Sequence, residues 1–178
     1  MFTKNSKAII FGLQISAAQS MLDFDFLSNR DPSVVAFINP GKKTSSKKLF
    51  FGDKEILVPI YGDFDSIPKN IKKETDTLVN FASFRSAFEA TKGAMESKIF
   101  KNIIIIAEGI PERQTREFIA LNKKYKLNIV GPATVGAIEA GVFRAGNTGG
   151  ALENIVASKL YKTGSVGFVS KSGGMSNE

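Results

Sequence analysis

Residues 7–18 read KAIIFGLQISAA, a short apolar run that ends at a glycine and leads into residues at helical spacing. The run Lys7–Phe11 has the length and the isoleucine content of a buried strand. After Gly12, apolar residues recur three or four positions apart, at Ile15, Ala18 and Leu22. That spacing predicts one face of a helix. A strand that passes through glycine into a helix is the opening unit of a fold in which strands and helices alternate.

The same alternation continues along the chain. Further strands are predicted at Val34–Asn39, Thr77–Phe81, Asn102–Ala107 and Asn128–Gly131, and helices at Ser83–Ser97 and Pro111–Lys126. This order predicts an α/β fold with a Rossmann-like parallel sheet covered on both faces. Leu49–Ile60 places Gly52 and Asp53 between two β-prone runs, which predicts a hairpin added at the sheet edge.

The helix predicted at Ser83–Ser97 has two faces. Its core face is expected to carry Phe84, Ala87, Phe88, Thr91 and Met95, and its outer face carries Arg85, Glu89, Lys92 and Glu96. The segment Gly41–Lys48 (GKKTSSKK) is expected to be a mobile basic loop.

The pattern changes near residue 150, after the glycine-rich stretch Gly146–Gly150. We expect a domain over residues 1–150, followed in 151–178 by a linker helix at Ala151–Leu160 and a strand at Ser165–Ser170. That strand runs into a glycine-rich turn with no helix after it, so the β-α unit is incomplete. The sequence is therefore expected to be a fragment of a longer polypeptide.

Composition excludes several kinds of site. The 178 residues contain no cysteine and no histidine, so disulfides, thiolate nucleophiles, histidine bases and Cys or His metal ligands are all impossible here. No acidic cluster predicts a metal site, and no apolar run approaches the roughly 20 residues of a membrane helix. The net charge is +7, mostly from lysine, but few aromatics lie among the lysines. This favours attraction of a phosphorylated small molecule over nucleic acid.

The turn Gly12–Ala17 is the first candidate site, because the first β-α turn of such a fold commonly cradles a phosphate at the helix start. Only the first glycine of the dinucleotide fingerprint is present. A phosphate site, a dinucleotide site and a purely structural turn all remain open on this segment alone.

Three further candidates follow predicted strands or begin a predicted helix. Glu108 comes directly after the isoleucine-rich strand, where it could orient a catalytic group or simply complement a helix dipole. Arg85 in a first helical turn would oppose the dipole, so a bound anion would explain it, as would an exposed side chain that extends into solvent. Ser172–Gly174 form an anion-type turn, although such turns also end many strands.

Several ordered segments together resemble one known family. They are Ala8–Asp25 (AIIFGLQISAAQSMLDFD), Lys54–Pro59 (KEILVP), Asn80–Ala87 (NFASFRSA), Ile105–Glu112 (IIAEGIPE), Val130–Val135 (VGPATV), Gly146–Gly150 (GNTGG) and Ser170–Glu178 (SKSGGMSNE). Across nearly the whole chain the sequence resembles the CoA-binding part of ATP-citrate lyases, relatives of the succinyl-CoA synthetase α subunit. The resemblance implies that residues after 150 open a second α/β domain of flavodoxin-like type.

The resemblance also implies roles for named residues. CoA would be held by Gly12, Gln14, Ile15, Ser16, Pro40, Lys42, Phe81, Ala82, Ser83 and Arg85. Glu108 would orient a phosphohistidine of the following domain, and Ser172, Gly173 and Gly174 would meet the citrate or phosphoryl group. Ser16 stands where the family commonly has a basic residue, and Lys42 or Lys43 could supply the phosphate charge instead.

For the complete enzyme, the resemblance implies conversion of citrate to acetyl-CoA and oxaloacetate through citryl phosphate and citryl-CoA. It implies ATP and Mg²⁺ bound mainly outside this chain, an ATP-grasp module or small subunit, a citrate-synthase-like module, an oligomer, and a cytoplasmic location. Two alternatives stay open: the α subunit of an acyl-CoA ligase that uses another acid, and a non-catalytic regulator that binds CoA or a dinucleotide.

Overall fold

The computed structural model describes residues 1–176. The strands are β1 (Ala8–Phe11), β2 (Val34–Ile38), β3 (Ser45–Phe51), β4 (Lys54–Tyr61), β5 (Thr77–Asn80), β6 (Asn102–Ile105), β7 (Asn128–Val130), β8 (Gly136–Glu139) and β9 (Phe143–Gly146). The helices are α1 (Ile15–Leu27), α2 (Lys69–Glu74), α3 (Ala87–Ser97), α4 (Glu112–Tyr125) and α5 (Leu152–Ala157), with a 3₁₀ turn at Gly174–Ser176.

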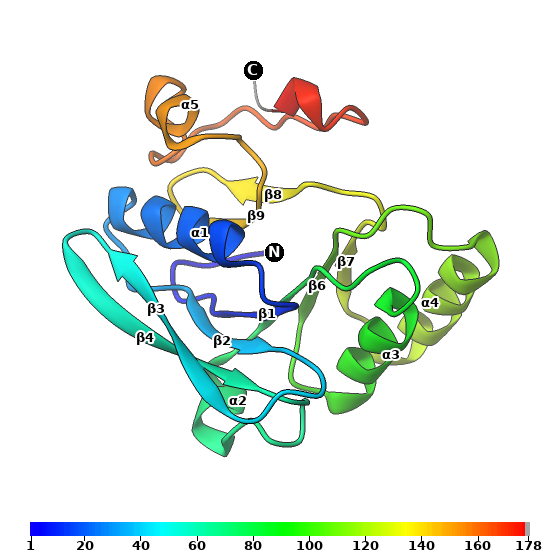
Figure 1. Cartoon of the computed structure of the whole chain (residues 1–178). Coiled ribbons are helices and arrows are strands. Elements are labelled where there is room, and N and C mark those ends of the chain that lie inside the picture. The colour runs from blue at the N-terminus through cyan, green and yellow to red at the C-terminus, as the bar shows by residue number, and fades with distance from the viewer. Residues whose placement is uncertain (177–178) are drawn as a thin grey trace.

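Seven strands form one sheet in the order β3-β4-β2-β1-β5-β6-β7 (Figure 1). All neighbouring pairs are parallel except β3 with β4, which form an antiparallel hairpin at the edge. The predictions of a Rossmann-like parallel sheet and of an edge hairpin are therefore confirmed. The hairpin is longer than expected, because Ser45–Lys48, predicted to lie in a mobile loop, belong to β3.

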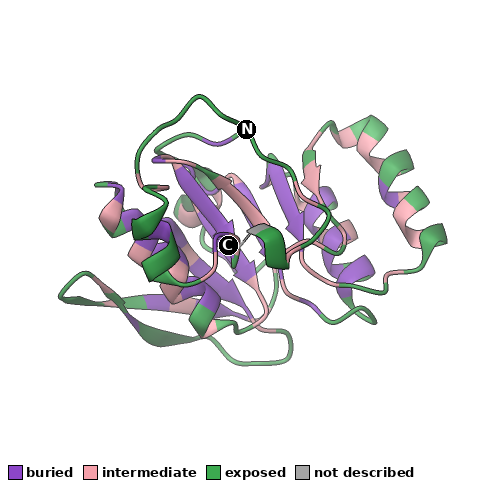
Figure 2. Cartoon of the chain, turned by 90° about the horizontal axis from the view of Figure 1, so that it is seen from above, coloured by how far each residue is buried: buried purple, intermediate pink, exposed green. Residues whose placement is uncertain are grey.

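The two faces of the sheet are covered by different elements, and alternate residues of β1 show the division. Ile10 packs in a cluster with Met21 of α1 and Phe143 of β9. Ile9 packs on the other side with Phe88 of α3 and Phe118 of α4. Side chains alternate across a strand, so two cores form on opposite faces of one sheet. Figure 2 shows these buried strands between helices whose outer sides are exposed.

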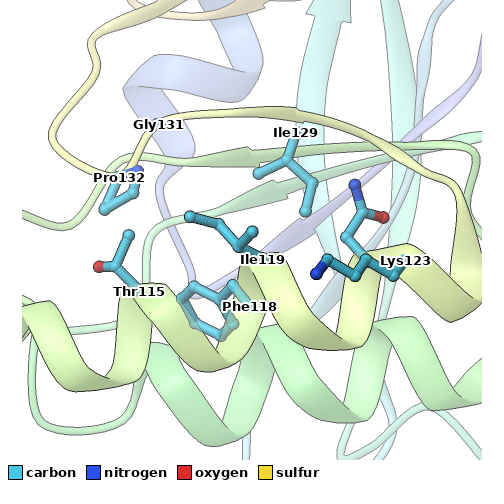
Figure 3. A pocket seen from close by; sticks show the side chains of 8 residues that line it. Thr115, Phe118, Ile119, Lys123, Ile129, Gly131 and Pro132 are labelled. Atoms are coloured by element: carbon cyan, nitrogen blue, oxygen red, sulfur yellow. The ribbon is translucent and has the colours of Figure 1, made fainter.

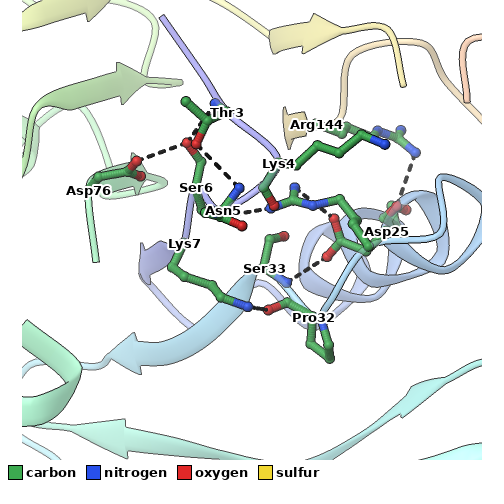
Figure 4. Close-up of polar contacts among 12 residues, drawn as sticks. Thr3, Lys4, Asn5, Ser6, Lys7, Asp25, Pro32, Ser33, Asp76 and Arg144 are labelled. Atoms are coloured by element: carbon green, nitrogen blue, oxygen red, sulfur yellow. Dashed lines mark hydrogen bonds and ion pairs between the residues drawn. The ribbon is translucent and has the colours of Figure 1, made fainter. Parts of the chain in front are cut away.

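A buried ion pair ties α1 to the segments around it (Figure 4). Arg30 Nη1 donates to Asp25 Oδ1 at 3.0 Å, and Asp25 Oδ2 accepts a hydrogen bond from the Ser33 N–H at 2.7 Å. Arg30 Nη2 also donates to the backbone oxygens of Lys4 and Ser6. The pair thus connects the N-terminal segment, the end of α1 and the start of β2.

The C-terminal segment departs from expectation. Helix α5 lies inside the predicted Ala151–Leu160, but residues 165–170 form no strand, and Val166, Phe168 and Val169 are 92%, 68% and 99% exposed. A strand needs a neighbour for its backbone hydrogen bonds, and within residues 1–176 no strand pairs with this segment. The strand prediction is therefore wrong for the structure described, while the division near residue 150 stays a prediction.

The small hairpin β8–β9 was not predicted. No helix among the described residues is long and apolar enough to cross a membrane.

Candidate functional site

Four turns meet at one edge of the sheet. They follow β2, β1, β5 and β6, which are adjacent and parallel, so all four turns lie at the carboxyl ends of these strands. Ligands of open α/β sheets collect at this edge. The predicted CoA residues and Glu108 lie in these four turns or in the first turn of α1, although they are spread over nearly a hundred positions of sequence.

The turn after β1 presents an open helix end. Gln14 is the N-cap of α1, no side chain caps it, and the first turn carries no acidic residue. Gln14 and Ser16 are exposed. The backbone N–H groups and the positive end of the helix dipole therefore face solvent, an arrangement that suits a phosphate. Gly12 has φ +94°, a backbone conformation that favours glycine, and a Cβ on it would lie 3.4 Å from Phe81 Cβ, so the turn after β1 is next to the turn after β5.

The turn after β5 is held by a buried amide that the sequence analysis did not single out. Asn80 Oδ1 accepts the Ala82 N–H at 2.9 Å, and Asn80 Nδ2 donates to Thr91 Oγ1 of α3 at 3.0 Å. Phe81 N–H donates to Phe11 O at 2.9 Å. Asn80 thus fixes Phe81 and Ala82 between β1 and α3. An isolated amide that ends an apolar strand was the available signal.

Arg85 and Phe84 lie before helix α3, which begins at Ala87 rather than Ser83. Ser83 O accepts the N–H groups of both Ser86 and Ala87, so residues 83–86 form a turn. Phe84, expected in the core, is 50% exposed, and the Arg85 guanidinium carbon lies 5.4 Å from the centre of its ring. The predictions that Phe84 lies in the core and that Arg85 lies in the first turn of the helix are therefore wrong. The turn instead offers a cation and an aromatic face at the sheet edge.

The turn after β2 contributes positive charge. Pro40, Lys42 and Lys43 are exposed, and Lys42 N–H donates to Asn39 O at 3.2 Å. Among the described residues, neither lysine makes a salt bridge. Their ammonium groups are therefore available to a phosphorylated ligand.

Glu108 and the C-terminal turn are connected through the segment that follows β7. Glu108 is exposed, and its neighbour Ala107 accepts the Ala133 N–H at 2.9 Å. A Cβ on Gly173 would lie 2.9 Å from Val135 Cγ1. Residues 133–135 therefore stand between the turn after β6 and the predicted Ser172–Gly174 turn.

A separate cavity of about 410 Å³ lies between α4 and β7 (Figure 3). Phe118, Ile119 and Ile129 give it an apolar wall, and Lys123 is its one charged lining residue among those the structure describes. None of the predicted CoA residues lines it.

Several known proteins are similar to this chain. The sequence matches the family described as "CoA binding domain" over residues 3–109, a range that contains all four turns up to Glu108. The probable ATP-citrate synthase subunit 1 of Schizosaccharomyces pombe is 50% identical over 179 residues, which cover 100% of this chain and 29% of that protein. The ATP-citrate synthase of Homo sapiens is 49% identical over 180 residues, 100% of this chain and 16% of that protein.

The solved structures agree. An ATP citrate lyase from Methanothrix soehngenii, in complex with citrate and coenzyme A, matches with a TM-score of 0.92 and 49% identity, over 99% of this chain and 29% of that one. A dinucleotide-forming acetyl-coenzyme A synthetase from Ca. Korarchaeum cryptofilum matches at 18% identity with a TM-score of 0.54, a likeness of fold alone. The chain thus spans less than a third of the length of these relatives.

Proposed function

The chain belongs to the family of CoA-binding domains, and on that premise we propose that the turns at the carboxyl edge of its sheet hold CoA for an ATP-citrate lyase reaction. The single observation that carries this proposal is the open N-terminus of α1, set directly against the Phe81 turn. A helix end without a cap, next to a rigid turn, can accept a phosphate without rearranging.

The residues divide the binding between them. The backbone of Gly12–Ser16 would receive a phosphate group through N–H donors, and Lys42 or Lys43 would add positive charge from the neighbouring turn. Phe81–Arg85, fixed by Asn80, would hold the rest of the ligand against the edge. CoA supplies the thiol that forms the thioester.

Glu108 would serve the chemistry rather than the binding. Its carboxylate follows a buried strand and lies at the same edge as the open end of α1. In the family that the sequence resembles, a carboxylate here orients the phosphohistidine of the next domain. Ser172–Gly174, which lie beyond residues 133–135, would meet the citrate or phosphoryl group.

The remaining parts of the reaction belong to the whole enzyme. The relatives are more than three times longer than this chain, and one solved relative binds citrate and coenzyme A. We infer that ATP and Mg²⁺ are bound by an ATP-grasp module or subunit, that a citrate-synthase-like module cleaves citryl-CoA, and that the enzyme is a cytoplasmic oligomer.

Calorimetry on the purified chain tests the binding part. CoA should bind saturably, and radiolabelled ATP should leave no phosphohistidine, because the chain contains no histidine. Absence of CoA binding by a folded sample would contradict the assignment of the site. A phosphohistidine signal in the sample would therefore have to come from another protein.

A further inference from the structure

A basic cavity of about 600 Å³ lies at the opposite edge of the sheet. Its walls come from α2, from the end of α3, and from residues that precede β1, β5 and β6. These are the amino-terminal ends of the strands, so the cavity is separate from the turns proposed to hold CoA.

Five lysines line this cavity against two carboxylates. The lysines are Lys69, Lys72, Lys73, Lys98 and Lys101. Of the two acids, Asp76 is engaged by the protein: its carboxylate accepts hydrogen bonds from Ser6 Oγ at 2.8 Å and Thr77 Oγ1 at 2.7 Å. Figure 4 shows the Ser6 contact. Asp76 therefore has a structural role just before β5, and the two carboxylates together offset only part of the charge of the five lysines.

Most of these ammonium groups have no partner in the protein. Lys72 Nζ donates to Asp65 O at 3.1 Å. For the other four lysines, the described residues provide neither a salt bridge nor a side-chain hydrogen bond. Like charges around one cavity repel one another, and a bound anion would relieve that repulsion.

Helix dipoles explain only part of this arrangement. Lys72 and Lys73 lie in the last turn of α2, and Lys98 is the C-cap of α3, where cations are favourable. Lys69 is the first residue of α2, where a cation opposes the dipole, and Lys101 precedes a strand. Their presence at the same cavity is unexplained by helix stabilisation.

We propose that this cavity binds a compact polyphosphate, a ligand with two or more phosphate groups and no aromatic base. Several ammonium groups around one space suit several anionic groups held together. Thr3 and Asn5 add polar side chains for hydrogen bonds to phosphate oxygens. Among the described residues, none that lines the cavity is aromatic, so nothing offers a stacking face for a base.

Titration with sodium tripolyphosphate at low ionic strength tests the proposal, and amide NMR spectra locate the site. Binding should shift the amide signals of residues 69–76 and 97–101, and CoA should not compete for it. Shifts confined to residues 12–17 and 39–43, or competition by CoA, would overturn the proposal by placing the anion at the CoA edge. CoA binding itself is measured separately, so the two proposals fail independently.

Two matched charge variants complete the test. Lys73→Gln with Lys101→Gln should weaken tripolyphosphate binding about tenfold or more, a change of about 1.4 kcal/mol. Lys47→Gln with Lys54→Gln removes the same charge from exposed positions of the β3–β4 hairpin and should change it less than twofold. If tripolyphosphate binding is weakened equally in both variants, the binding depends only on the net charge of the protein, and the proposal is overturned. If the first variant is unfolded by circular dichroism, Lys69→Gln alone should still weaken binding measurably.

Two other anions, citrate and poly-glutamate, are titrated in the same way for comparison. Citrate should bind more weakly than tripolyphosphate, because its carboxylates carry less charge for their size. If poly-glutamate binds while tripolyphosphate does not, the cavity is a site for an acidic polypeptide, and the proposal is wrong.

Discussion

Arg85 is exposed just before α3, with its guanidinium over the Phe84 ring. If it donates to a CoA phosphate, Arg85→Ala should weaken CoA binding by about 1.5 to 3 kcal/mol, the range for hydrogen bonds to charged groups. The penalty should shrink at high salt, because an exposed charge is screened.

Arg113→Ala is the matched control for this change. Arg113 is also exposed and bonds only to Glu117 within its own helix among the contacts described. Calorimetry should show unchanged CoA affinity for this variant. If both variants bind CoA as the wild type does, Arg85 is not a ligand contact.

The role proposed for Glu108 is in the chemistry, so its test requires the full-length enzyme. Glu108→Gln keeps the shape and removes the charge. Turnover should fall by roughly 10² or more, the range for a positioned acid-base group, while CoA affinity stays within a few fold. Measuring kcat, CoA affinity and phosphoenzyme together separates the roles. Wild-type turnover would mean that Glu108 has no part in the chemistry, and loss of CoA binding with normal phosphorylation would make it a ligand contact.

Asp25 makes stability depend on pH. Desolvation by burial raises the pKa of this carboxyl to about 6, although Arg30 and Ser33 favour its charged form. The folded state therefore holds the proton more tightly than the unfolded chain, where the pKa is about 4. The associated stability is present below about pH 4 and is lost as the pH rises through about 6, a change on the order of 3 kcal/mol.

Chemical denaturation from pH 4 to pH 7 tests this dependence, with Asp25→Asn as the variant that cannot titrate. The free energy of unfolding of the wild type, relative to the variant, should decrease across this range. A relative free energy that stays level or increases would contradict the raised pKa. If the variant does not fold, the carboxyl carbon signal of Asp25 in the wild type should still titrate near pH 6.

The turn after β5 is an element whose shape depends on one buried side chain. Asn80→Ala would leave the Ala82 N–H and Thr91 Oγ1 without their partner, at a cost of about 1 to 3 kcal/mol of folding free energy. The Phe81–Arg85 turn should also lose its fixed position. Calorimetry should therefore show weaker CoA binding at a temperature where the variant is fully folded.

A second buried amide provides the control. Asn102 donates to Thr77 Oγ1 and accepts from Asn128 Nδ2, at the amino ends of β6 and its neighbours. Asn102→Ala should lower stability by a similar amount and leave CoA affinity unchanged. Equal loss of CoA affinity in both variants would mean that Asn80 acts through stability alone.

The elements with a strong local pattern could be predicted from the sequence. Lys7–Gly12 and the isoleucine run of β6 are apolar enough to be buried strands in any compact fold. The start of α3 could not be predicted, because β5 is followed by a loop in which the Ala82 N–H donates to Asn80 Oδ1 and Ser83 O accepts from the Ser86 and Ala87 N–H groups. Residues 165–170 have a strand's composition, but a strand forms only where a neighbour is present.

Part of the candidate site could also be predicted from the sequence. Parallel strands bring their carboxyl ends to one edge, so Gly12, Phe81 and Glu108 could be assigned to the same edge once a parallel sheet was predicted. Asn80 ends an apolar strand, and its two partners lie 2 and 11 positions further along the chain, so its sequence position was an available signal. The basic cavity could not be predicted in this way, because it depends on contacts between distant segments.

At the scale of the whole molecule, the chain carries two anion-attracting edges on one sheet. The carboxyl edge has an open helix end and a fixed turn, and the amino edge has the lysine-lined cavity. The match to the CoA-binding family covers residues 3–109, which include every proposed CoA contact and also every residue that lines the basic cavity. The open helix end and the fixed turn therefore carry the central claim, which is that CoA binds at the carboxyl edge of this sheet.

Hydrogen exchange measured by mass spectrometry, with and without CoA, tests that claim most directly. CoA should slow exchange in residues 12–17, 39–43 and 81–86, the three turns that the proposal brings to one ligand. Exchange in residues 69–76 and 97–101 should not change. Protection confined to those last segments, or to the cavity between α4 and β7, would contradict the account. Unchanged exchange in every segment at a saturating CoA concentration would also contradict it.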